Sequence, residues 1–393
     1  MRLCFLTGEY PPMQGGVADH TAHLARRLSD LGVEVLVLTS RKAAITTRER
    51  PGSDPRVTVH PIIRNWGYAC WRRIGSFLAE QRPDVLHIQY QAAAYDLTGW
   101  VNALPWRLRW QRGRPRLVVT FHDLRVPYLF HKAGPLRWQA IIWLARYADA
   151  VIVTNAEDAQ TLRRYPWSRH VQLVPLGSNV DAAPPPDYER PTWRQRLGIA
   201  NDELLLAYFG FLNQSKGGET LVLALQQLLQ GGLPASLLMI GGQVGDVDPT
   251  NRAYAERVRQ LIQARGLEGR VHWTGFVSPE EVSAHLLAAD AVVMPYQDGV
   301  SFRRTTLIAA LRHGCPVVTT QPAIPHPELR EGENVLLVPA GDPTALAEAL
   351  SRLARDPALR ARLAAGALEL GRRFDWAQIT HQTLDVYRRV MGG

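Results

Sequence analysis

The chain has 393 residues, of which 46% are hydrophobic and 21% charged, and this composition is typical of a globular protein and excludes a largely disordered or collagen-like chain. The length exceeds what one core usually covers, so two domains of roughly 200 residues or less are expected. The formal charge of +9 favours anionic partners such as nucleotides, phosphorylated lipids or membrane surfaces, and no apolar run is long enough for a transmembrane helix.

The first part of the chain alternates predicted strands and helices. A strand at 3–6 leads into the loop 9–16, and apolar residues at helical spacing between Val17 and Leu31 then form one face of a helix that Gly32 ends. Further strands are predicted at 33–38, 57–63, 85–89, 117–121, 150–154 and 171–175. Strand-helix-strand units build parallel sheets, so residues 1–177 are predicted to form a Rossmann-like, doubly wound α/β domain.

A linker is predicted at 178–191, because Pro184, Pro185 and Pro186 cannot continue a helix or a central strand. The pattern then restarts, with strands at 204–209, 236–240, 271–274 and 335–338, and with helices at 254–265 and after Asp342. Ser278 and the glutamate three residues later form a predicted capping box at the start of another helix. Residues 192–375 are therefore predicted to be a second Rossmann-like domain, with the active site in a cleft between the two.

Residues 289–320 combine a predicted strand, loop, helix and strand. Ser301 is the predicted N-cap of this helix and Gly314 can end it. Arg303 and Arg304 then fall in the first helical turn, where cations oppose the helix dipole at a cost of roughly 0.3 to 1 kcal/mol each unless an anion is bound. The pattern is therefore a reason to look for a phosphate here, and the equally weighted alternative is that both arginines reach solvent or pair with carboxylates.

Two other loops open onto helices and could bind an anion. Gly15 and Gly16 would let backbone amides approach a ligand closely, although a tight turn without a ligand is the alternative. Lys216 follows a strand that ends at Gly210 and precedes the first helix of the second domain, which suits a phosphate. The alternative is a surface lysine, but the chain has only three lysines, which disfavours a chance placement.

Other candidate residues give weaker signals. His122 ends a strand at the carboxyl edge, where it could donate a hydrogen bond or a proton, whereas His87 in mid-strand is interpreted as a buried, satisfied histidine. Asp246 and Asp248 could share a divalent ion, but no third ligand is evident, so no metal is expected. Walker, Gly-x-Gly-x-x-Gly and Ser-His-Asp patterns are absent from the sequence, which argues against P-loop, nicotinamide and hydrolase functions.

The cysteines and tryptophans bear on the cellular compartment of the protein and on its contact with membranes. Three distant cysteines lie in or near apolar runs and are predicted to be buried thiols of a reducing compartment, so a cytoplasmic location is expected. Trp100, Trp106 and Trp110 alternate with arginines up to residue 116. An ordinary amphipathic helix is the favoured interpretation of this stretch, and contact with an anionic membrane surface is the alternative.

Taken in order, motifs along nearly the whole chain resemble the retaining glycosyltransferases of family 4, also called glycosyltransferase group 1, which have the GT-B fold. The motifs are GEYPP followed by GG, HIQY, TFHD, VTNAED, VPLG, GFLNQSKGGETLVLAL, LLMIGG, VHWTGFVSPEE, ADAVVMPY, AALRHGCPVVTT, GDPTALAEAL and FDWAQI. The resemblance implies an acceptor domain at the amino terminus and a nucleotide-sugar domain at the carboxyl terminus. It also implies that the last helix, 376–393, packs back on the first domain.

The resemblance carries roles over to individual positions. Lys216 would bind the donor diphosphate, His122 would hydrogen-bond the transferring sugar, and Gly16 would contact the donor. The predicted donor-binding set is Gly15, Gly16, Gly210, Asn213, Lys216, Gly241, Phe276, Val277, Ser301, Phe302, Arg303, Arg304 and Thr305. The predicted acceptor-binding set is Glu9, Tyr10 and Asp19, and the predicted catalytic set is His122, Asp298 and Lys216.

The chain also departs from the family pattern. Phe211 stands where the family commonly has an arginine, and the two family glutamates would fall at Ser301 and Ala309. An alternative alignment places Asp298 at the first glutamate position, where it would hold sugar hydroxyls. Part of the diphosphate binding is therefore inferred to have moved to the two arginines that follow Phe302.

The predicted function is that of a retaining, hexosyltransferase-type enzyme that moves a sugar from a nucleoside diphosphate sugar to a hydroxyl acceptor. The leaving phosphate would itself accept the acceptor proton, and no metal or other cofactor is expected. A lipid-linked acceptor and peripheral membrane contact stay open, and no nucleic acid partner is expected. The alternative is a non-catalytic GT-B subunit of a glycan or membrane assembly, and the retained Lys216 and His122 speak against it. The sequence does not predict the oligomeric state, the sugar, the base or the acceptor.

Overall fold

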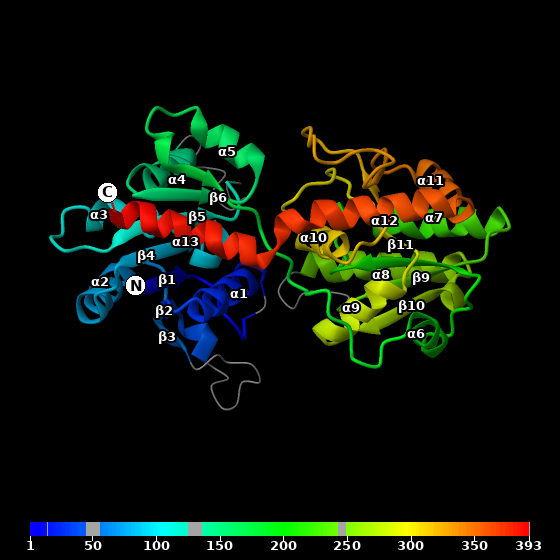
Figure 1. Ribbon diagram of the computed structural model, residues 1–393, viewed down its shortest axis with the longest axis horizontal. Helices are drawn as coiled ribbons and strands as arrows, with labels where there is room; N and C mark the ends of the chain where they lie inside the picture. Colours follow the sequence, from blue (N-terminus) through cyan, green and yellow to red (C-terminus); the bar gives the residue numbers. More distant parts are fainter. Residues whose placement is uncertain (14, 45–55, 125–135, 243–248, 393) are drawn as a thin grey trace. The chain divides into compact units, whose positions relative to one another are not determined.

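A computed structural model describes residues 1–13, 15–44, 56–124, 136–242 and 249–392 (Figure 1). The chain divides into two compact units. The first unit comprises Met1–Gly177 together with Trp376–Gly393, and the second comprises Ser178–Asp375.

The first unit is built on a seven-stranded parallel sheet with the order β3-β2-β1-β4-β5-β6-β7. Its strands are β1 (Arg2–Thr7), β2 (Glu34–Ser40), β3 (Val57–Ile63), β4 (Val85–Tyr90), β5 (Arg116–Phe121), β6 (Ala150–Val153) and β7 (Val171–Leu173). Because every strand runs the same way, the loops that follow all of them leave from one edge of the sheet, where such folds bind ligands.

Helices cover both faces of this sheet. Successive side chains of a strand point to opposite faces, so Leu3 and Phe5 of β1 join one core while Cys4 and Leu6 join the other. The first core is covered by α1 (Gly16–Asp30) and α13 (Trp376–Gly392). The second core is covered by α2 (Cys70–Gln81), α3 (Leu104–Leu108), α4 (Leu136–Arg146) and α5 (Ala156–Arg163).

The carboxyl-terminal helix α13 completes the first unit. It lies on the same side of the first sheet as α1 (Figure 1), and its buried Trp376 and Tyr387 belong to the core that α1 covers. A Cβ atom on Gly177 would overlap the Trp376 ring. Glycine is therefore required at this position, which is the last residue of the first unit before the chain enters the second. The expectation that the last helix packs on the first domain is confirmed.

The second unit is built on a six-stranded parallel sheet with the order β10-β9-β8-β11-β12-β13. Its strands are β8 (Leu204–Phe209), β9 (Ala235–Ile240), β10 (Val271–Gly275), β11 (Ala291–Met294), β12 (Val317–Thr320) and β13 (Leu336–Val338). Its helices are α6 (Arg190–Arg196), α7 (Gly218–Gln230), α8 (Pro249–Ala264), α9 (Pro279–Ala288), α10 (Thr305–Arg312), α11 (Pro343–Arg355) and α12 (Pro357–Gly371). Apolar residues of α7, α8, α11 and α12 pack with the sheet in one core.

Two predicted helix starts in the second unit are confirmed. The Ser278 hydroxyl accepts the Glu281 N–H at 3.2 Å, and the Glu281 carboxylate accepts the Ser278 N–H at 2.9 Å, which together form the predicted capping box of α9. Asp342 caps α11 by accepting the N–H groups of Thr344 and Ala345.

The predicted linker is too long at its end, because α6 already begins at Arg190. Proline is tolerated in the first helical turn, where its missing N–H would have no partner, so Pro191 lies inside the helix. The buried Arg194 holds α6 in place through a 3.0 Å ion pair with Asp290, which also accepts the Leu205 N–H.

The amphipathic helix favoured for the tryptophan and arginine stretch is wrong. Only Leu104–Leu108 is helical, and turns follow until Gly113, which has a left-handed φ of 69°. Pro115 then precedes β5 and excludes a continuous helix through the stretch. Among the described helices, none combines the length and apolar character needed to cross a membrane.

All three cysteines are buried and unpaired, as predicted. Burial raises the pKa of the Cys4 thiol to about 12, of the Cys70 thiol to about 11 and of the Cys315 thiol to about 12. These thiols are therefore inert at neutral pH and serve as small apolar side chains.

Candidate functional site

Two loops of the second unit meet at the carboxyl edge of its sheet. One follows β8 and the other follows β11, the neighbouring strand. The Gln297 N–H donates to the Ser215 carbonyl at 2.8 Å, and the Gln297 side chain donates to Thr220 Oγ1 of α7 at 3.1 Å. These contacts join the two loops, so groups from both strands contribute to one local site.

Lys216 is the central cation of this site. It ends the short 3-10 helix Gln214–Lys216, after which Gly217 turns the chain into α7 with a left-handed φ of 69°. The half-buried Lys216 Nζ would lie 3.0 Å from a Cβ atom on Gly210, so glycine at the end of β8 makes room for the ammonium group. Burial, and next the nearby Arg304, lower the pKa of Lys216 to about 8.

This ammonium group has no counterion of its own, since Lys216 pairs with no carboxylate among the residues that the structure describes. A half-buried cation beside a second cation is destabilised until an anion binds. The N-terminus of α7 lies next in the chain and adds a partial positive charge. The geometry therefore suits an anionic ligand such as a phosphate.

Arg304 extends the site from the second loop. Its Nη2 atom donates to both carboxylate oxygens of Asp298 at 2.6 Å, and its guanidinium group lies 4.7 Å from the centre of the Tyr296 ring. The Tyr296 hydroxyl is 3.3 Å from Thr306 Oγ1, and the Thr306 methyl group lies beside Gly210. Arg304 and Asp298, predicted to hold different parts of a donor, are thus paired with each other in this structure.

The predicted start of the helix after this loop is wrong. Helix α10 begins at Thr305 with Arg304 at its N-cap position, because the Ser301 carbonyl accepts the Arg304 N–H in a separate turn at 3.2 Å. Arg303 and Arg304 therefore precede the helix and do not lie in its first turn. An anion is therefore indicated by the Lys216 ammonium group and not by the dipole of α10.

Phe302, another predicted donor contact, is buried in this structure. Its ring packs against Phe374 and His326 at centroid distances of 5.1 and 5.2 Å. The ring therefore anchors the loop in the core of the second unit, and this explains how Arg304 and Asp298 are held at the surface on either side of it.

The remaining predicted donor residues lie in loops after β8, β9 and β10. Gly241 has a left-handed φ of 104° and donates its N–H to Thr274 Oγ1 at 3.1 Å, while Asn213 accepts the Ser215 hydroxyl at 2.8 Å. Phe276 is 82% exposed and Val277 is half-buried. The exposed Phe276 ring is available to contact a planar group.

Phe211, which replaces the family arginine, is partly exposed and lies against the loop after β9. Its Cε1 atom would be 3.3 Å from a Cβ atom on Gly242. Asp246 and Asp248, which were considered as a metal pair and not expected to bind a metal, lie outside the described residues. Within the described ranges, no three histidine, cysteine, aspartate or glutamate side chains gather in a way that could hold a metal ion.

In the first unit, carboxylates occupy the N-terminus of α1. Glu9 follows β1 and lies against Gly15, where a Cβ atom would overlap its carboxylate, and Asp19 stands in the first turn of α1. Burial, and next the Asp19 carboxylate, raise the pKa of Glu9. Because these carboxylates already balance the helix dipole, a hydroxyl group is a better ligand here than a phosphate. A Cβ atom on Gly16 would meet no atom of the described residues within 4 Å, whereas Tyr10 is buried in the core.

His122 lies at the carboxyl end of β5 and is buried. Its Nε2 atom is 2.8 Å from Gln89 Oε1, an oxygen that can only accept a hydrogen bond. Nε2 therefore carries the proton of the neutral ring, and Nδ1 is unprotonated. Burial, and next His87, lower the pKa of His122 to about 3, so the ring is neutral at physiological pH. His122 can therefore exchange hydrogen bonds with a ligand but cannot act as a cationic acid.

The interpretation of His87 as a satisfied histidine is confirmed. Its Nδ1 atom is 2.6 Å from the Tyr387 hydroxyl and its Nε2 atom is 2.7 Å from Thr120 Oγ1. Sequence reasoning missed Gln89 and Tyr387, which belong to this buried network. Gln89 could have been found, because it lies near the carboxyl end of a predicted strand beside that of His122, whereas Tyr387 is 300 residues from its partner.

His20 was also missed. It is buried on α1, its ring lies 5.0 Å from that of His122, and its Nδ1 atom has no hydrogen-bond partner among the described residues. Burial, and next His122, lower the pKa of His20 well below its usual value. The first unit thus presents neutral histidines and acidic carboxyl groups at its sheet edge, while the second unit presents cations.

Comparison with known proteins gives two family matches. Residues 189–369 match the family described as Glycosyl transferases group 1, and residues 15–177 match the family described as Glycosyl transferase 4-like domain.

Curated relatives cover most of the chain. The D-inositol 3-phosphate glycosyltransferase of Nocardioides sp. is 31% identical over 326 residues, which are 79% of this chain and 69% of that protein. The phosphatidyl-myo-inositol mannosyltransferase of Mycobacterium leprae is 27% identical over 384 residues, which are 96% of this chain and 93% of that protein.

Solved structures match over the full length. Sucrose-phosphate synthase from Thermosynechococcus elongatus has a TM-score of 0.77 at 24% identity, covering 100% of this chain and 99% of that one. HepE of Anabaena in complex with UDP-glucose has a TM-score of 0.72 at 20% identity, with 98% of each chain covered.

Proposed function

This chain belongs to the group 1 glycosyl transferases and has their GT-B fold, and from that premise we propose that it transfers a sugar from a nucleoside diphosphate sugar to a hydroxyl acceptor with retention of configuration. The single observation that carries the proposal is the half-buried Lys216 ammonium group. It lies beside a second cation, Arg304, and it has no counterion among the described residues. A diphosphate supplies the missing negative charge.

The donor is assigned to the second unit. Lys216 and Arg304 would bind the diphosphate, and Gly210 and Gly217 would let the backbone approach it. When the glycosidic bond breaks, negative charge grows on the leaving phosphate, and cations fixed beforehand stabilise that charge most. HepE, which has the same fold, was solved with UDP-glucose, and this supports a nucleotide sugar as the donor.

The first unit is assigned to the reacting sugar and the acceptor. We expect neutral His122 to hydrogen-bond a hydroxyl of the sugar, with Gln89 holding the ring in one tautomer. Because His122 is not a cationic acid or a poised base, the acceptor proton is assigned to the leaving phosphate oxygen. Asp298 would hold sugar hydroxyls while it stays paired with Arg304.

The acceptor is proposed to be a polyol of the inositol class, free or attached to a lipid. The Glu9 and Asp19 carboxylates accept hydrogen bonds from hydroxyl groups, and they would repel a phosphate from their own position. Two relatives act on inositol phosphate or phosphatidylinositol by their names, which supports this class. The buried, unpaired cysteines fit a cytoplasmic location.

Direct transfer tests the proposal. Purified protein is incubated with a panel of nucleoside diphosphate sugars and with inositol 3-phosphate or phosphatidylinositol, and the product is analysed by NMR. One donor should give product whose anomeric configuration equals that of the donor. Inverted product would contradict the retaining mechanism. A donor that raises the melting temperature without any transfer would favour the non-catalytic alternative instead.

Donor binding should weaken as the pH rises from 7 to 9. Free Lys216, with its pKa lowered to about 8, is mostly charged at pH 7 and mostly neutral at pH 9, and the diphosphate needs the charged form. The dissociation constant should rise about tenfold over this range. Calorimetric titration with a nucleoside diphosphate sugar measures it, because the donor phosphates do not titrate there. The Lys216→Arg variant keeps its charge and should show a flat profile, whereas a flat profile in the unmodified protein would contradict the assignment.

A further inference from the structure

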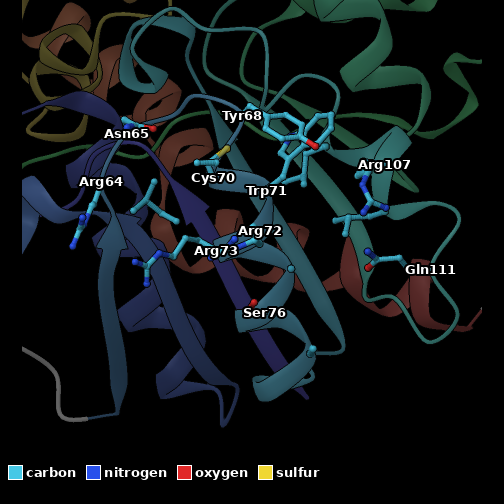
Figure 2. A pocket seen from close by; sticks show the side chains of 16 residues that line it. Arg64, Asn65, Tyr68, Cys70, Trp71, Arg72, Arg73, Ser76, Arg107 and Gln111 are labelled. Atoms are coloured by element: carbon cyan, nitrogen blue, oxygen red, sulfur yellow. The ribbon is translucent and has the colours of Figure 1, made fainter.

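A cavity of about 870 Å³ lies in the first unit, and its lining includes none of the residues assigned to transfer. Its lining comes from the end of β3, from α2 and its preceding loop, and from α3 and the turn after it (Figure 2). Four arginines line it, namely Arg64, Arg72, Arg73 and Arg107, and none of its described lining residues is acidic.

These arginines are exposed, and none of them forms an ion pair with another described residue. Arg72 and Arg73 stand near the start of α2, whose first turn contains no acidic residue. Cations there repel one another and oppose the helix dipole. The cavity therefore favours a ligand with concentrated negative charge.

Exposed aromatic rings lie beside the cations. Tyr68 is 66% exposed and Trp100 is 40% exposed, and both contact Trp71 at ring distances of 5.5 and 5.4 Å. The Trp71 indole N–H donates to the Trp100 carbonyl at 2.8 Å, which fixes this cluster. Large rings with a polar atom are typical of surfaces that sit at the boundary between lipid and water.

The ring geometry separates a membrane from a single-stranded nucleic acid. Trp71 meets Trp100 at 88° and Tyr68 meets Trp100 at 68°, so the rings cover one another edge to face. Nucleic acid binding uses open ring faces on which successive bases stack. Rings whose faces are contacted by the edge of a neighbouring ring offer less open face for stacking, and such a cluster suits insertion among lipid headgroups better.

We propose that the surface formed by Arg64, Tyr68, Arg72, Arg73, Trp100 and Arg107 docks on an anionic phospholipid bilayer. Headgroup phosphates bind the arginines, and Tyr68 and Trp100 lie at the boundary of the acyl chains. This docking goes beyond sugar transfer and does not depend on it. It would bring the first unit to a membrane whether or not the acceptor is a lipid.

Vesicle co-sedimentation of the full chain, without donor or acceptor, tests this docking. The protein should bind vesicles of phosphatidylcholine mixed with phosphatidylinositol and should not bind phosphatidylcholine alone. Replacing Arg72 and Arg73 by glutamine should lower the partition coefficient roughly 30-fold, since each basic residue near an anionic surface contributes about fivefold. Replacing Tyr68 and Trp100 by serine should lower it on the same vesicles without changing its salt dependence.

The matched control replaces Arg163 and Arg164 by glutamine. These are also adjacent, exposed arginines of the first unit, at the end of α5, and form no ion pair with another described residue. The control should bind like the unmodified protein, and equal losses in both variants would show that net charge alone acts and would overturn the proposal. Equal binding to neutral vesicles would overturn it too. Displacement by soluble inositol 3-phosphate at matched phosphate concentration, or by single-stranded RNA, would assign the cavity to that ligand instead.

Discussion

Alanine in place of Lys216 should lower kcat/KM for sugar transfer by about 100-fold to 1000-fold, the range expected when one fixed electrostatic group is removed from an active site. The reason is that Arg304, the second cation assigned to the diphosphate, is a weak substitute for Lys216. Arg304 is already held by both oxygens of Asp298, so its charge is partly neutralised before the donor binds. Most of the affinity for the nucleoside diphosphate product should disappear with the ammonium group.

Steady-state kinetics together with calorimetry measure this effect. Arg259→Ala is the matched control, because this arginine of α8 has a side chain that is 48% exposed and only a 3.2 Å surface contact with Glu256 of the same helix. It should leave both quantities unchanged. If Lys216→Ala retained half of the activity, the diphosphate site would have to lie elsewhere.

Alanine in place of Gly217 should lower the free energy of unfolding of the second unit by about 3 kcal/mol or more. Losses of this size are typical of steric overlap or of an unpaired buried charge. Two causes add at this position. Gly217 has a left-handed φ of 69°, and a Cβ atom there would overlap the Pro295 carbonyl oxygen and lie 2.8 Å from Gln297 Nε2. Relief of the overlap would separate the loops after β8 and β11, so donor affinity should fall with stability.

Gly232→Ala separates these two causes. Gly232 is in the same unit and has a similar φ of 76°, but a Cβ atom there would have no neighbour within 4 Å in the described part of the chain. It should therefore cost only the backbone strain of about 1 to 2 kcal/mol, and donor affinity should stay unchanged. Denaturant unfolding measures both variants. Equal losses would mean that the contact with Pro295 is not a real constraint.

Much of the fold could be predicted because buried parallel strands read as continuous apolar runs. The predicted ranges 57–63 and 204–209 equal those of β3 and β8. Helix starts were predicted correctly where one local device decides them, as at Ser278. The start of α10 was predicted wrongly because a separate turn competes with the helix there. The Ser301 carbonyl accepts the Arg304 N–H in that turn, and α10 begins only at Thr305.

The candidate site was predictable only where it is local in sequence. A lysine that follows a strand ending in glycine and directly precedes a helix is visible in the sequence, so Lys216 could be named as a candidate from the sequence alone. The pairing of Arg304 with Asp298 could not be read, because it depends on how the loop folds around the buried Phe302. The network from Tyr387 through His87 depends on the place of α13 in the three-dimensional structure, which no local pattern encodes.

The position of α13 has a consequence for biosynthesis. The second unit is continuous in sequence, whereas the first unit needs its final 17-residue helix to cover the face that α1 shares with the sheet. A chain emerging from the ribosome can therefore complete the second unit while Leu24 and Leu28 of α1 still lack their partners. The first unit cannot be completed until α13 has been translated, so premature termination anywhere before α13 leaves an apolar surface open to aggregation.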